Sequence, residues 1–134
     1  MKKKLDLSTV TTLEAVYAIA KPTSEEQSLF DYKGESKGMI AAQGILQLDM
    51  INKVLNDGVV MDFMDRNQWK YFGYFWVVKD DSKATGFGLS LDGVDYTDTS
   101  ADVGARLCFV DEKTFRHAFK YFPEIFEKVL IVYK

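Results

Sequence analysis

The chain has 134 residues, of which 47% are hydrophobic and 28% are charged, and its formal net charge is -3. This length suits one domain, so we expect residues 1–134 to share a single core, and the composition excludes a disordered protein. The mildly acidic balance also lacks the large positive field that drives general binding to duplex nucleic acid.

The first half of the chain predicts helices. Residues 11–14 have the pattern of a capping box ahead of apolar positions at helical spacing, and Pro22 ends that helix. Residues 24–30 predict a further short helical segment. Residues 39–55 carry one apolar stripe at helical period, and Gly58 suits the left-handed residue that follows a helix.

From residue 69 the pattern becomes that of strands. Residues 69–78 are aromatic and β-branched, and residues 87–91 alternate in polarity. The dipeptide at 92–93, Asp-Gly, predicts a hairpin turn before another short strand. Residues 105–109 predict a last strand, so we expect an antiparallel meander of three to four strands.

The last segment predicts a helix that packs on this sheet. Asp111 can cap it, and apolar residues then recur at helical spacing. Pro123 interrupts the hydrogen-bond ladder, so we expect a kink or a fresh helix start there. The expected fold class is α+β, with N-terminal helices, the meander and a C-terminal helix.

A catalytic thiol would need Cys108, the only cysteine, to be activated by His117, the only histidine. A lone cysteine in a strand is more typical of a small buried hydrophobe. No third residue is apparent that would orient the histidine, so an enzyme is the least favoured function.

The acidic residues predict neither a metal site nor a cofactor site. Asp92, Asp95 and Asp98 are spaced by three, which does not match a calcium-binding loop. Asp62 and Asp65 lie among apolar residues, where burial would raise a carboxylate pKa, but solvated acids are the simpler interpretation.

The aromatic content is high, with ten Phe, seven Tyr and two Trp. Residues 69–78 place apolar or aromatic side chains on both faces of one strand. Such a strand is by default covered on both sides, and otherwise it is partly exposed for a partner. With Phe72 facing the core, the opposite face would offer rings, the usual anchors of interfaces together with arginine. The residues that we expect to bind are Arg66, Trp69, Tyr71, Phe75 and Arg106.

The same region supports an alternative, because proteins that bind single-stranded nucleic acid place rings beside a basic groove. Residues of this kind are Arg66, Trp69, Lys70, Tyr71, Tyr74 and Trp76. A modest basic patch is a further candidate surface for RNA or an acidic protein. It would combine the N-terminal lysines with Lys113, Arg116, Lys120 and Lys128.

Residues 69–75, 86–88 and 104–109 resemble a family of small phage and prophage proteins of gut Bacteroidetes, and the similarity extends over residues 52–134. Pro123 departs from the usual pattern of that family's last helix. The family has no established activity. Small phage proteins without catalytic motifs are commonly virion components, nucleic-acid accessories or inhibitors of host proteins, which work through surfaces.

The leading hypothesis is therefore a non-catalytic, phage-derived protein that contacts another protein, whether a second copy, a virion protein or a host protein. The alternative is a single-stranded nucleic-acid-binding accessory. We expect it in the host cytoplasm or the virion. The lysines at positions 2–4 precede no apolar run that would make a signal peptide, and no stretch approaches the roughly 18 apolar residues that cross a membrane.

Overall fold

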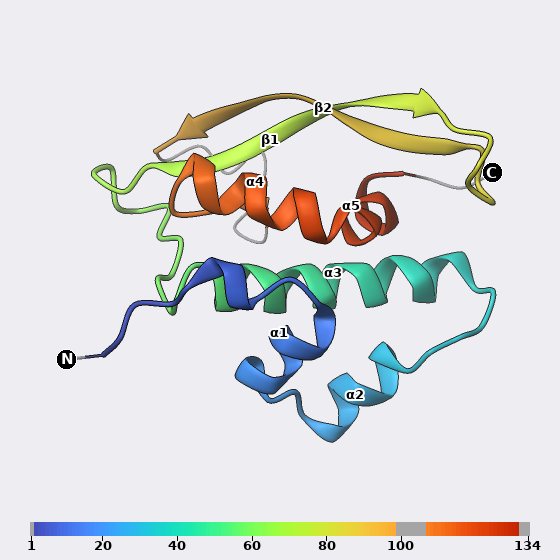
Figure 1. Ribbon diagram of the computed structural model, residues 1–134, viewed down its shortest axis with the longest axis horizontal. Helices are drawn as coiled ribbons and strands as arrows, with labels where there is room; N and C mark the ends of the chain where they lie inside the picture. Colours follow the sequence, from blue (N-terminus) through green and yellow to red (C-terminus); the bar gives the residue numbers. More distant parts are fainter. Residues whose placement is uncertain (1, 99–106, 132–134) are drawn as a thin grey trace.

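The computed structural model describes residues 2–98 and 107–131. In Figure 1 the long hairpin lies at the top, and the helix pair α4 and α5 lies beneath it. Helix α3 lies beneath that pair, with α1 and α2 on the far side of α3. These described elements belong to the α+β class, as predicted. In chain order they are the 3₁₀ helix η1 (Leu7–Thr9), α1 (Leu13–Ala20), α2 (Ser24–Phe30), α3 (Lys37–Leu55), β1 (Lys70–Lys79), β2 (Phe87–Thr97), α4 (Glu112–Tyr121) and α5 (Pro123–Leu130).

Side-chain caps fix where the first two helices begin. The hydroxyl of Thr12 accepts a hydrogen bond from the backbone N–H of Ala15 (3.2 Å) at the start of α1. At α2, Thr23 and Glu26 form a complete capping box, in which each side chain accepts from the other's backbone N–H. In place of the capping box expected at 11–14, α1 has the Thr12 cap one residue later, and α2 covers the helical segment expected at 24–30.

Helix α3 is the longest helix, with 19 residues. It ends at Asn56, and Gly58 then adopts a φ of 82°, which confirms the predicted left-handed stop. At Gly44 it approaches α5 so closely that an added Cβ atom would lie 2.6 Å from the Cβ atom of Lys128. Neither α3 nor any other helix within the described residues is long and apolar enough to cross a membrane.

Strands β1 and β2 form an antiparallel hairpin that is closed by residues 80–86, where Asp80 N–H bonds to Gly86 O (2.8 Å). The turn predicted at 92–93 is wrong. Asp92 is instead the extra residue of a β-bulge, between the pairs Tyr74–Gly93 and Phe75–Leu91. The small, acidic Asp-Gly pair suits a bulge as well as a turn, which is why the local pattern was misleading.

The expected meander of three to four strands is not confirmed, because the described residues form a two-stranded sheet. The expected last strand falls partly outside them, and its end meets β1 at a single bridge between Phe109 and Tyr71. On either side of this bridge, the Cys108 carbonyl and the Val110 N–H bond to the side chain of Asn56, the residue that caps the end of α3 (3.2 and 3.0 Å). Because these two backbone groups bond to Asn56, they do not extend the hydrogen-bond ladder with β1.

The C-terminal part is two helices rather than one. Asp111 caps α4 by accepting from the N–H of Thr114 (2.7 Å), as predicted. Pro123 begins α5, which confirms the expected fresh start. The apolar sides of both helices bury phenylalanines against α3 and the hairpin. The fully buried core includes Val10, Val16, Leu48, Ile51, Phe109, Phe115 and Phe126.

Candidate functional site

The hairpin has helices on only one side within the described part of the chain (Figure 1). Side chains alternate between the two faces of a strand. Tyr71, Gly73 and Phe75 face α4 and α5, as do their partners on β2. We call this the inner face. We call the opposite one the outer face and its β1 side chains the aromatic row, which comprises Phe72, Tyr74, Trp76 and Val78.

Tyr74, Trp76 and Val78 of the aromatic row are exposed, and their partners on β2 are small. Gly93 lies opposite Tyr74, and Ser90 lies opposite Trp76. The Tyr74 ring crosses the position of a missing side chain, since an added Cβ atom at Gly93 would lie 2.7 Å from Tyr74 Cζ. Tyr74 is 48% exposed, Trp76 63% and Val78 38%. Tyr74, Trp76 and Val78 thus form an apolar strip on the outer face that the described residues leave open to solvent.

The residues selected from the sequence do not all lie on this strip. Phe75 packs into the core, with its ring centroid 5.0 Å from that of Phe119 and 5.8 Å from that of Phe126. Trp69 and Tyr71 form a second ring cluster with Tyr96 at the base of the hairpin, with centroid distances of 4.8 and 5.8 Å to Tyr96. Trp69 is half-exposed in that cluster and Tyr71 is half-buried.

Neither of the two selected arginines belongs to β1 or β2. Arg66 is exposed in the loop before β1, and Arg106 lies outside the described residues. Sequence reasoning placed Phe72 on the core side and so exchanged the two faces. Gly73 carried the signal that could have corrected this, because Phe115 occupies the space of its missing side chain. An interior strand glycine often marks such a close approach.

The surroundings of the aromatic row are acidic. Asp92 and Asp95 are exposed on β2: Asp95 lies on the outer face opposite Phe72, and Asp92 is the extra residue of the bulge beside Gly93. Lys70 belongs to the same face but is fully buried, and its ammonium donates to the carbonyls of Asp65 (2.8 Å) and Asp98 (2.6 Å). It therefore offers no accessible positive charge to a ligand.

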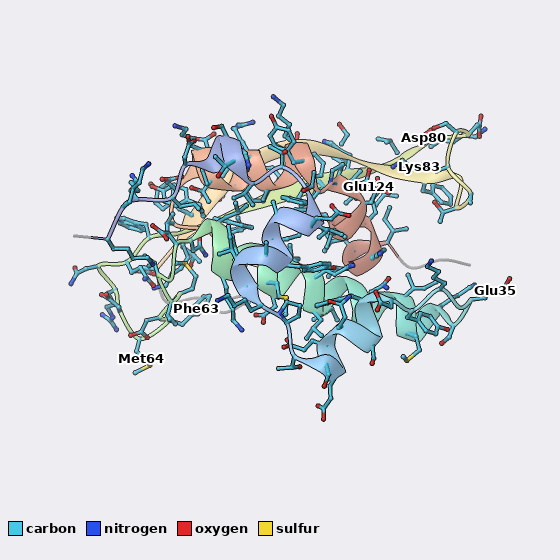
Figure 2. The ribbon with its side chains drawn as sticks, turned by 60° about the horizontal axis from the view of Figure 1, so that its bottom comes forward. Glu35, Phe63, Met64, Asp80, Lys83 and Glu124 are labelled. Carbon is cyan, nitrogen blue, oxygen red and sulfur yellow. The ribbon has the colours of Figure 1, made fainter. Side chains whose placement is uncertain are left out.

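The lysines at the hairpin tip form salt bridges with acidic side chains. Asp80 and Lys83 lie together there (Figure 2), and Lys83 bonds to Glu127 of α5 at 2.6 Å. That hydrogen bond raises the pKa of Lys83 above its ordinary value. Lys79 pairs with Asp81 at 3.8 Å. The net electrostatic character of the outer face and the tip is negative.

The candidate thiol site has the properties of a packed interior. Cys108 is fully buried, and burial raises its pKa to about 11, so the thiol stays protonated at neutral pH. A ring nitrogen of His117 lies 2.7 Å from the carbonyl oxygen of Val10, and the ring packs on Tyr121. The arrangement gives the sulfur no thiolate character, which nucleophilic catalysis requires.

The acidic loops do not converge on one point. No group of three or more His, Cys, Asp or Glu side chains within residues 2–98 and 107–131 is placed to hold a metal ion. Asp62 and Asp65 are exposed, and their carboxylates accept hydrogen bonds from the N–H groups of Met64 and Asn67 within their own loop (2.8 and 2.9 Å).

A polar groove of about 790 Å³ collects part of the expected basic patch, bringing Lys4 beside the basic residues of α4. Asp6, Asp57 and Asp111 line the same groove, and Arg116 pairs with Glu112 (2.8 Å). These acids offset most of its positive charge. Lys128 lies elsewhere, between α3 and α5, where it bonds to Gln43 (2.9 Å) and Gln47 (3.2 Å).

An apolar cavity of about 330 Å³ lies between the inner face of the hairpin and the helices. Its walls include Phe75, Val77 and Leu89 of the hairpin, with Phe126 and Leu130 of α5. Its lining is mainly apolar. No protein-family model, curated protein or solved structure matches this chain, so the surfaces described above are what a functional proposal can use.

Proposed function

We propose that this chain is an interaction protein that binds another protein through the outer face of its hairpin. The observation that carries the proposal is the exposure of Tyr74, Trp76 and Val78 in one row on one strand. Contact between such an apolar strip and water costs free energy, and a docking partner removes that cost by covering the strip. Tyrosine and tryptophan are frequent anchors of interfaces.

The contacts of the described residues do not require aromatic side chains at these positions. The inner face packs against the core through residues such as Phe75, Leu89 and Leu91. Polar residues at positions 74 and 76 would satisfy the alternation of a half-buried strand equally well. Contiguous exposed apolar patches are uncommon on monomers and mark interaction sites. A virion protein or a host protein is the partner class that the resemblance to phage proteins favours.

The proposal is tested by purifying the tagged full-length protein from cells that naturally carry its gene. We expect a partner to co-purify with the wild-type chain and to be lost from Tyr74→Ala and Trp76→Ala. Tyr121→Ala is the matched control, because Tyr121 is an exposed ring on α4 that lines the polar groove. A partner that is retained by both hairpin variants would refute the proposal.

The second candidate is binding of single-stranded nucleic acid, which the exposed rings of Tyr74 and Trp76 favour because bases stack on such rings. The carboxylates of Asp92 and Asp95 oppose it, since they would repel a phosphate backbone. We therefore expect oligothymidylate at low salt to leave tryptophan fluorescence unchanged. Quenching that weakens as salt rises would instead favour this second candidate.

A further inference from the structure

We propose that the segment that docks on the outer face is cationic, presenting arginine or lysine side chains to Tyr74, Trp76, Asp92 and Asp95. This inference rests on the proposed function and adds the chemistry of the partner. Two independent features support it: the exposure of the rings on the outer face and the sign of the charges beside them.

The rings of Tyr74 and Trp76 are available to a cation. Both side chains are about half exposed or more, on neighbouring outward positions of β1. The face of an aromatic ring carries negative electrostatic potential, so an ammonium or guanidinium group stacks on it favourably, and tryptophan is the strongest such acceptor. Arginine adds a planar group that can lie parallel to the ring.

The carboxylates stand beside those rings. Asp95 is opposite Phe72 in the hairpin register, and Asp92 directly precedes Gly93, which is opposite Tyr74. Residues opposite each other on one face of an antiparallel pair have Cβ atoms about 4.5–5.5 Å apart. A cation stacked over Tyr74 would therefore lie next to both carboxylates. A guanidinium group can bond to such a carboxylate with two of its N–H groups.

Among the described lysines of the hairpin, Lys70 and Lys83 do not compete for these sites. Lys70 is buried against two backbone carbonyls, and Lys83 is held by Glu127. The whole chain is also acidic, with a net charge of -3. Complementary charge speeds the encounter with a basic partner and suppresses pairing with an acidic one.

The same charges disfavour other occupants. A second copy stacked face to face would bring Asp92 and Asp95 of one chain toward the same carboxylates of the other, and like charges in contact are repulsive. A phosphate backbone meets the same repulsion. Both occupants are outcomes of the following test.

The test uses the full chain carrying Trp69→Phe, so that Trp76 is the remaining tryptophan and its fluorescence reports on the outer face. The probes are a hexa-arginine peptide and a hexacitrulline peptide, which has nearly the same shape but no charge. We expect hexa-arginine to change the Trp76 emission at low salt, to weaken as salt rises, and to bind at least tenfold more tightly than hexacitrulline.

Charge variants locate the binding site. Asp92→Asn combined with Asp95→Asn should weaken hexa-arginine binding about fivefold or more, because the outer face loses both carboxylates. The control is Glu14→Gln with Glu25→Gln, which changes the net charge equally at exposed positions on α1 and α2, beyond α3 from the hairpin (Figure 1). The affinity of this control for hexa-arginine should stay within twofold of that of the Trp69→Phe chain.

Four outcomes would overturn the inference. They are equal binding of the two peptides, equal effects of the two double variants, tighter binding of oligothymidylate than of hexa-arginine, and concentration-dependent dimers that Trp76→Ala dissolves. If one of them occurs while Trp76→Ala still loses the natural partner, the interaction surface stands and only its cationic partner is rejected. If the natural partner is retained as well, the proposed function also fails.

Discussion

The ring of Phe115 on α4 occupies the space beside Gly73 that a side chain at position 73 would fill. An added Cβ atom there would lie 2.6 Å from Phe115 Cε1. The strand can approach the helix this closely only at a residue without a Cβ atom. This contact identifies the inner face of the hairpin, and it leaves Tyr74 and Trp76 on the outer one.

Gly73→Ala should lower the free energy of unfolding by about 1–3 kcal/mol, because the added methyl group must displace either the ring or the strand. Urea denaturation measures the loss. Gly38→Ala is the control, since a Cβ atom at Gly38, in the first turn of α3, meets nothing within 4 Å. Its stability should stay the same or rise by a fraction of the roughly 1 kcal/mol that separates the helix propensities of glycine and alanine. Equal losses in the two variants would contradict the contact.

Adjacent residues of β1 should respond differently to truncation. Phe75→Ala removes a ring that packs on Phe115, Phe119 and Phe126, and we expect it to cost about 3 kcal/mol. Trp76→Ala removes a ring that is 63% exposed, so its cost should stay below about 1 kcal/mol. Chemical denaturation of both variants compares them directly. The reverse order of these losses would mean that the two faces are exchanged.

Asn56→Leu should destabilise the fold by about 2–4 kcal/mol. The side chain of Asn56 donates to Asn52 and to the Cys108 carbonyl and accepts from the Val110 N–H, so a leucine would remove all three bonds at a buried site. Lys53→Gln on the same turn is the control. Lys53 is exposed and pairs with Asp49, and such surface pairs contribute less than about 1 kcal/mol. A loss below that of the control would exclude the proposed bonds.

The thiol of Cys108 should make stability fall at alkaline pH. Burial raises its folded-state pKa to about 11, whereas the unfolded thiol ionises from about pH 9. The thiol's contribution is therefore complete below about pH 9 and is lost as the pH rises to about 11, by up to about 3 kcal/mol. Urea denaturation across this range should show a shallower decline for Cys108→Ala. Parallel curves for the two proteins would show that the thiol is already solvated.

Local signals in the sequence predicted the helices well. The cap at Asp111, the stop at Gly58 and the restart at Pro123 depend on a few neighbouring residues, so a short stretch of sequence contains the whole cause. The strand β1 was likewise identified from its aromatic and β-branched residues.

Tertiary contacts decided what the sequence alone left open. Both faces of β1 carry rings, so alternation could not say which face meets the helices, and Phe75 was selected although it lies in the core. Lys128 belonged to a predicted basic patch, but α3 offers two glutamine side chains that bind it. The carboxylates beside the aromatic row became relevant only when the bulge at Asp92 fixed the register of β2.

The most direct test of the outer face is collisional quenching of Trp76 by acrylamide in the Trp69→Phe chain, measured at a dilution where the protein is monomeric. The account predicts that Trp76 is quenched readily and emits like a solvated tryptophan, and that a bound partner shifts the emission to the blue and protects the ring. A blue-shifted emission that resists quenching in the free monomer would contradict it.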